Sequence, residues 1–100
     1  MLNKKIKKLE IGYGKVNKVH IGENLPLAFL GGPCAIESRD HAFKMAELIG
    51  EICLKVGISW VYKSCYDKDC RSSPESFHGL GKDDGLTILS DIRTEFKVPV

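Results

Sequence analysis

The hydrophobic residues of this 100-residue chain change period along its length, and the change predicts alternating strands and helices. Residues 27–30, LAFL, form a continuous apolar run of the kind expected for a parallel strand that is covered on both faces. The run ends in Gly-Gly-Pro at 31–33, where a strand would pass into a loop. A second strand is predicted over residues 58–65, and residues 98–100 are typical of the start of a third.

Two segments between these strands have the three- and four-residue spacing of amphipathic helices. The first follows Ser38, which can cap a helix N-terminus, carries Asp40 in its first turn, and stops at Gly57. The second begins near Lys82 and keeps an apolar stripe as far as Phe96. Strand, helix, strand, helix, strand is the order of a parallel α/β fold, whose ligands bind beyond the carboxyl ends of the strands.

The N-terminal segment is predicted to form a β-hairpin. Within residues 4–24, apolar residues precede and follow a Gly-Tyr-Gly turn at 12–14. Lysines crowd this segment, but the whole chain carries a net charge of only +2. No aromatic ladder or binding motif accompanies the lysines, so a solvated leader is favoured over a nucleic-acid-binding arm.

Composition predicts a cytoplasmic protein with one packed core. Hydrophobic residues make up 43% of the chain and charged residues 28%. The longest apolar run, residues 25–30, is interrupted by Pro26, so neither a secretory signal nor a membrane segment is expected. The four cysteines contain no Cys-x-x-Cys pair and are predicted to be reduced thiols.

Groups that bind anions are concentrated in residues 62–81, YKSCYDKDCRSSPESFHGLG, which leave the second predicted strand. Strand alternation places Lys63 beside Val61 and Cys65 on one face. A lysine in that position is costly to desolvate unless an anion or a carboxylate meets it, although an edge lysine that reaches solvent is the alternative. Arg71 and the two serines after it add donors suited to phosphate. The segment therefore predicts a phosphate or carboxylate site.

Two motifs in these loops carry a resemblance to a known family of enzymes. They are GGPCAIES at 31–38 and YKSCYDKDCRSS at 62–73. They resemble the first two strand-end loops of 3-deoxy-D-manno-octulosonate 8-phosphate synthase, the second of which reads F-K-[AS]-S-F-D-K-A-N-R-S-S. The similarity covers about residues 25–100. Related synthases of 3-deoxy-heptulosonate phosphate have a shorter K-P-R-[ST] loop, so the spacing favours the octulosonate branch.

The resemblance implies the first strands and helices of a (β/α)8 TIM barrel. Residues 1–26 would form a hairpin that caps the bottom of the barrel, and residues 27–100 would supply two βα units and the start of a third strand. A complete barrel needs about 250 residues. An N-terminal fragment of the enzyme is therefore expected, and the family implies a homotetramer when the barrel is complete.

By the same resemblance, the enzyme is a transferase of lipopolysaccharide biosynthesis that condenses phosphoenolpyruvate with D-arabinose 5-phosphate and releases phosphate. Lys63 and Lys68 would contact phosphoenolpyruvate. Arg71 and Ser72 would hold the phosphate of the sugar. These groups would neutralise charge and orient the substrates, and no residue is an obvious general base.

Three cysteines fall in the implied site. Cys34 takes the position of the ligating cysteine in metal-dependent family members, which implies a divalent metal ion and no organic cofactor. The other ligands, a histidine and two carboxylates, are expected beyond Val100. Cys65 and Cys70 replace a serine near phosphoenolpyruvate and an asparagine that reaches the sugar, and a thiol is the weaker hydrogen-bond partner.

Three alternatives stay open. The cysteine replacements also fit a catalytically inactive remnant of the family, and the related heptulosonate phosphate synthase is a second possibility. A thiol or metal module built from the four cysteines is the least favoured, because they lack ligand spacing and Cys53 points into a helix core.

Overall fold

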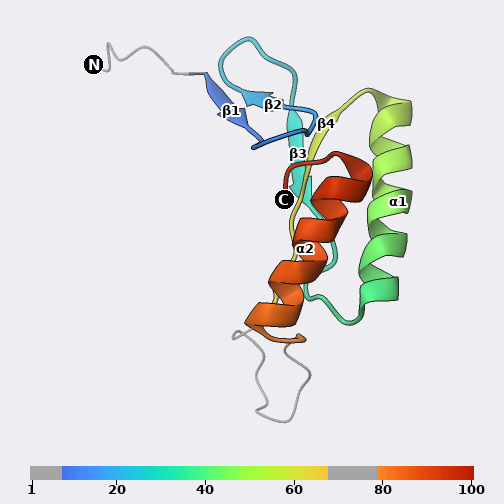
Figure 1. Cartoon of the computed structure of the whole chain (residues 1–100). Coiled ribbons are helices and arrows are strands. Elements are labelled where there is room, and N and C mark those ends of the chain that lie inside the picture. Colours follow the sequence, from blue (N-terminus) through green and yellow to red (C-terminus); the bar gives the residue numbers. More distant parts are fainter. Residues whose placement is uncertain (1–7, 68–78) are drawn as a thin grey trace.

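A short parallel sheet with two helices on one face forms the centre of the computed structural model, which describes residues 8–67 and 79–100 (Figure 1). A two-stranded hairpin lies at the end where the parallel strands begin. The elements in chain order are β1 (Leu9–Ile11), β2 (Val19–Ile21), β3 (Ala28–Gly31), α1 (Arg39–Val56), β4 (Ser59–Tyr62) and α2 (Lys82–Phe96).

The parallel pair β3 and β4 confirms the predicted strand–helix–strand unit. Their register runs from Ala28 opposite Ser59 to Gly31 opposite Tyr62. Strand β3 is shifted by one residue from the predicted range 27–30, and β4 is shorter than the predicted range 58–65. Residues 98–100 form no strand, but they lie beside β4, because the Tyr62 amide donates to the Pro99 carbonyl at 2.8 Å.

Both helices begin and end close to the predicted residues. At the start of α1, the Ser38 hydroxyl accepts a hydrogen bond from the His41 amide at 3.0 Å. At its end, Gly57 adopts a left-handed conformation with φ 72°, which glycine accepts without steric cost. The second helix starts at Lys82, as predicted. Within the described residues, no helix is long and apolar enough to cross a membrane.

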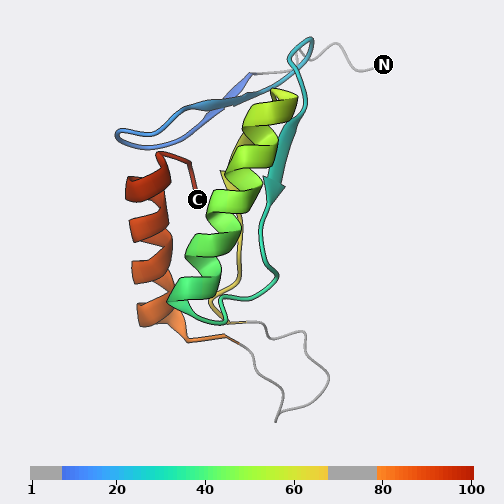
Figure 2. The ribbon, with the colours of Figure 1, turned by 90° about the vertical axis from the view of Figure 1, so that its right-hand side faces the viewer.

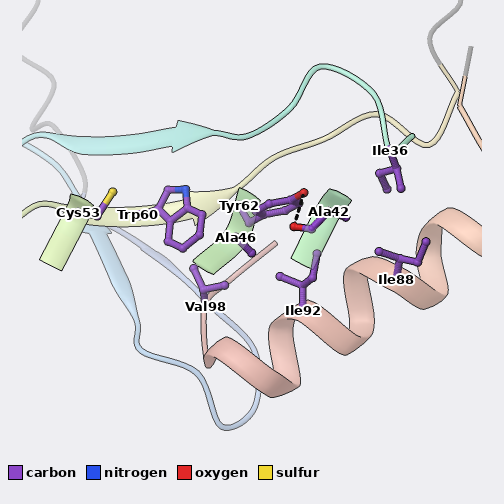
Figure 3. Packing of buried hydrophobic residues seen from close by; sticks show 9 residues of the cluster. All are labelled: Ile36, Ala42, Ala46, Cys53, Trp60, Tyr62, Ile88, Ile92 and Val98. Atoms are coloured by element: carbon purple, nitrogen blue, oxygen red, sulfur yellow. Dashed lines mark hydrogen bonds between the residues drawn. The ribbon is translucent and has the colours of Figure 1, made fainter. Parts of the chain in front are cut away.

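The core fills the space between the sheet and the two helices (Figure 3). Strand alternation puts Trp60 and Tyr62 on one face of β4, which packs against the helices, and their rings meet edge to face at 5.9 Å. Two small residues of α1, Ala42 and Ala46, let the helix approach these rings. The buried cluster comprises Ile36, Ala42, Ala46, Cys53, Trp60, Tyr62, Ile88, Ile92 and Val98.

The prediction that β3 is covered on both faces is wrong for this chain. Phe29 is 42% exposed and Leu30 is 49% exposed, although the two side chains leave opposite faces of the strand. Leu30 is left open because α1 and α2 both lie on the other side of the sheet (Figure 2). Phe29 is opposite Trp60 in the register and shares the helix side, but it lies on the strand at the edge of the sheet. Among the described strands, β3 pairs only with β4 and so keeps one free edge.

The hairpin is confirmed, with strands shorter than the predicted segment 4–24. Strands β1 and β2 pair antiparallel, and the His20 ring nitrogen Nε2 lies 3.1 Å from a carboxylate oxygen of its cross-strand partner Glu10. A backbone hydrogen bond of 2.8 Å from the Asn17 amide to the Lys97 carbonyl ties the hairpin to the end of α2. The β2 strand also contacts β3 and β4. Whether this hairpin caps a barrel stays a prediction.

Candidate functional site at the strand ends

Backbone hydrogen bonds hold the loops after β3 and β4 side by side. The Lys63 amide donates to the Gly31 carbonyl at 3.2 Å, and the Cys65 amide donates to the Cys34 carbonyl at 3.1 Å. The Ile36 amide then donates to the Cys65 carbonyl at 2.9 Å. The two motifs that the sequence analysis singled out therefore start at one edge of the sheet.

Close packing of the backbone at this edge requires a residue without a side chain. A Cβ atom added at Gly32 would lie 2.5 Å from the carbonyl oxygen of Lys63. Next to it, the Ser64 hydroxyl donates to the Pro33 carbonyl and closes the loop. No role was predicted for Ser64. The sequence feature that could have indicated one is a hydroxyl at a strand end, opposite a Gly-Gly-Pro loop whose carbonyls need donors.

The indole of Trp60 also supports the loop after β3. Its Nε1 donates to the Gly31 carbonyl at 3.0 Å, so this oxygen accepts from both the indole and the Lys63 amide. This bond was not predicted from the sequence. A buried indole N–H usually finds an acceptor, which was the available signal.

Of the predicted site residues, the structure brings Lys63, Cys65 and Cys34 together at this edge. Cys34 is exposed and Cys65 is half-buried. Lys63 is exposed, so the described residues do not desolvate its ammonium group. Its contact with an anion stays a prediction. The remaining predicted residues, Lys68, Cys70, Arg71 and Ser72, lie outside the described residues.

The described residues on either side of segment 68–78 meet next to β4. The Gly81 amide donates to the Tyr66 carbonyl at 3.1 Å, and Gly85 in the first turn of α2 packs against the Tyr66 side chain. A Cβ atom at Gly85 would overlap the Cβ atom of Tyr66, so glycine permits the close approach. The start of α2 is thereby fixed beside the strand-end loops.

Two ionisable groups in the core have pKa values raised by burial, Tyr62 below the strand ends and Cys53 at the opposite end of the sheet. Burial raises the pKa of the Tyr62 hydroxyl, and a hydrogen bond with Ser64 opposes this change. Burial also raises the pKa of the Cys53 thiol in α1. Neither group is placed to act as a base at the strand ends, because the Tyr62 ring lies in the core between the sheet and the helices and Cys53 lies at the opposite end of that core.

A metal ion could take one ligand from this edge. The Cys34 thiol follows β3, and the half-buried Cys65 is joined to Cys34 through the backbone. Among residues 8–67 and 79–100, no group of three or more His, Cys, Asp or Glu side chains is placed to hold a metal. The donors on hand thus fit a partial site, to which other ligands must be added.

Comparison with known proteins assigns the family. A model described as the DAHP synthetase I family matches residues 4–100. The chain belongs to this family. Membership agrees with the two strand-end motifs, which lie within the matched residues.

Curated relatives in this family carry the name 2-dehydro-3-deoxyphosphooctonate aldolase. One from Aromatoleum aromaticum is 48% identical over 79 residues, which are 79% of this chain and 28% of the relative. One from Bordetella bronchiseptica is 50% identical over 80 residues, or 80% and 28%. One from a Synechococcus strain is 44% identical over 84 residues, or 84% and 30%. The predicted resemblance to octulosonate phosphate synthases is confirmed, and this chain spans less than a third of the relatives' length.

Proposed function

We propose that this chain is the N-terminal part of an octulosonate phosphate synthase that condenses phosphoenolpyruvate with D-arabinose 5-phosphate. The observation that carries the proposal is the junction of the two strand-end loops, where the Cys65 amide donates to the Cys34 carbonyl. This junction sets the exposed Lys63 ammonium and two thiols at the end of the sheet where parallel α/β enzymes bind ligands. The relatives' name and the motif spacing support the same substrates.

The proposed reaction forms a carbon–carbon bond. Carbon 3 of phosphoenolpyruvate attacks the sugar aldehyde, water adds at carbon 2, and the resulting hemiketal phosphate releases inorganic phosphate. Both substrates are anionic and repel each other in solution. Lys63 would lower this repulsion, because its exposed ammonium is accessible to the phosphoenolpyruvate carboxylate or phosphate. Lys68, Arg71 and Ser72 would complete the contacts.

The uncovered surfaces of the chain support completion of a (β/α)8 barrel by further βα units. Parallel strands are normally covered on both faces, yet Leu27 next to β3 is 84% exposed. Along α1, Leu48, Ile52 and Val56 recur every four residues and form an exposed apolar flank. A strand paired with the free edge of β3, followed by a helix on this flank, would cover both features.

A divalent metal ion is part of the proposal. Cys34 would supply one thiolate ligand, and the remaining ligands would come from residues outside those described. When bound, such an ion would supply Lewis-acid chemistry at the sugar aldehyde or at water. A cytoplasmic homotetramer also stays a prediction.

The proposal is tested by completing the barrel in trans. The chain is co-expressed with the part of the Aromatoleum aromaticum relative that follows the matched segment, and phosphate release is measured with both substrates. Activity is expected only when both polypeptides and both substrates are present. The Lys63→Met variant should lose at least about 100-fold in rate, the scale of removing one charge-stabilising group. The control Lys44→Met, which changes an exposed residue of α1, should keep the rate.

The outcomes separate the alternatives. Binding of phosphoenolpyruvate without turnover identifies the inactive remnant. Turnover with a four-carbon sugar phosphate, but not with arabinose 5-phosphate, identifies the heptulosonate branch by carbon count. A reassembled complex that neither binds nor converts either substrate refutes the proposal, as does an active complex whose rate is unchanged by Lys63→Met.

A further inference from the structure

A second site candidate lies at the opposite end of the sheet from the strand-end loops. It is a cavity of about 430 Å³ between α1, the end of α2 and the hairpin. Its floor is apolar and includes Trp60, Phe96 and Cys53. Figure 3 places Cys53 and Trp60 together at this end of the core, away from Ile36 and Ile88. Its volume falls within the range of about 300–1,000 Å³ that is typical of small-molecule sites.

Gly50 of α1 lies directly against the aromatic floor of the cavity. Gly50 faces the indole from α1, and a Cβ atom built there would lie only 3.2 Å from Cζ3 of Trp60. Any larger side chain at this position would occupy the space in front of the ring. Glycine at this position lets α1 pack closely on the indole, at a cost of about 1 kcal/mol relative to alanine in a helix interior.

Charges around the cavity cancel. Lys18 of the hairpin and Lys97 after α2 line one part of the rim, while Glu47 and Glu51 of α1 line another. All four are exposed. Two positive and two negative side chains give no net attraction for a phosphate. The apolar floor, and not the rim, therefore decides what binds.

We propose that this cavity binds a small aromatic molecule without net charge. One or two fused rings match the volume and would contact the faces and edges of Trp60 and Phe96, an arrangement that aromatic pairs prefer. The Cys53 thiol adds a polarizable contact and no charge, because burial holds it in the neutral form. This inference is independent of the proposed synthase activity, since no strand-end residue takes part.

The test uses indole as the probe and Trp60 as the reporter. The chain contains one tryptophan, so an amide-correlation NMR spectrum of the 15N-labelled full chain shows a single indole N–H signal from position 60. Titration with unlabelled indole should shift this signal in a saturable manner. Phenyl phosphate, an aromatic probe of the same size class with a charged group, should bind at least about tenfold more weakly, since the rim offers no net positive charge.

Variants locate the response. Gly50→Leu should fill the cavity and abolish the shift, while Lys44→Leu on the solvent face of α1 should leave the dissociation constant unchanged. Circular dichroism checks that each variant folds, and Gly50→Ala, with a smaller side chain, should weaken binding without abolishing it. The proposal is overturned if indole causes no saturable shift, if Gly50→Leu folds and binds as before, or if phenyl phosphate binds more tightly than indole.

Discussion

Removal of the indole N–H of Trp60 tests whether one hydrogen bond holds the end of β3. Trp60 is 8% exposed, and its Nε1 lies 3.0 Å from the carbonyl oxygen of Gly31. In 3-benzothienylalanine a sulfur atom replaces the N–H group, and the fused rings keep their shape. This analogue at position 60 removes the donor but retains the edge-to-face contact with Tyr62.

The expected loss is about 1 kcal/mol in the free energy of unfolding, the net value of a typical intramolecular hydrogen bond. The larger penalty for a buried acceptor without a partner does not apply, because the Lys63 amide still donates to Gly31 at 3.2 Å. Trp60→Phe also loses the contacts of the larger ring. Its cost should be about 2 kcal/mol, below the 3–5 kcal/mol of truncating a buried aromatic residue to alanine.

Urea unfolding followed by circular dichroism gives the midpoint and slope of the transition, from which the change in stability is obtained. Amide hydrogen exchange at Lys63 and Cys65 reports on the strand ends, where the analogue should speed exchange before global unfolding. A wild-type midpoint together with unchanged exchange at both amides would show that Trp60 acts through packing alone. The claim that it supports the loop would then be wrong.

Two further predictions concern the buried ionisable groups. Burial raises the pKa of the Cys53 thiol, and the thiolate is the nucleophile in alkylation. Iodoacetamide at pH 8 should therefore alkylate the half-buried Cys65 at least about tenfold faster than Cys53. Equal alkylation rates, measured by peptide mass spectrometry, would contradict this. Burial raises the pKa of Tyr62 above 10.0, so its contribution to stability is complete below about pH 10 and is lost as pH rises through the higher folded-state pKa. Between pH 8 and pH 11, the urea midpoint of Tyr62→Phe should therefore fall less than that of the wild type, and an equal fall would refute the assignment.

Short sequence patterns were sufficient to predict the two helices and the order of strands and helices along the chain. Ser38 and Gly57 were predicted as the ends of α1 from the residues next to them in the sequence. The structure confirms both, with the Ser38 hydroxyl as the N-terminal cap and Gly57 in a left-handed conformation at the C-terminus. The exposure of Phe29 and Leu30 was not predictable in this way. A continuous apolar run shows that a strand can be covered on both faces, but the covering elements need not lie within the same 100 residues.

The site was predictable in position but not in its supports. Motif spacing put Cys34 and Lys63 at one edge, and the structure confirms that their loops meet. The bonds that fix this edge run from Trp60 to Gly31 and from Ser64 to Pro33, across 29 and 31 residues of sequence. No local pattern encodes such pairs, because they depend on the register of β3 against β4.

Strand β4 joins the two ends of the molecule that are proposed to bind ligands. The Trp60 ring lies on the helix side of β4, where it forms part of the cavity floor. Its Nε1 donates to the carbonyl of Gly31 at the end of β3. The Lys63 amide bonds to the same oxygen. A molecule that displaces the indole would therefore weaken a contact shared with the strand-end loop. If both sites bind, the coupling must be reciprocal, so that phosphoenolpyruvate changes the affinity for indole by the same factor as indole changes that for phosphoenolpyruvate. The analogue without the N–H group would break this link while leaving both proposed sites in place.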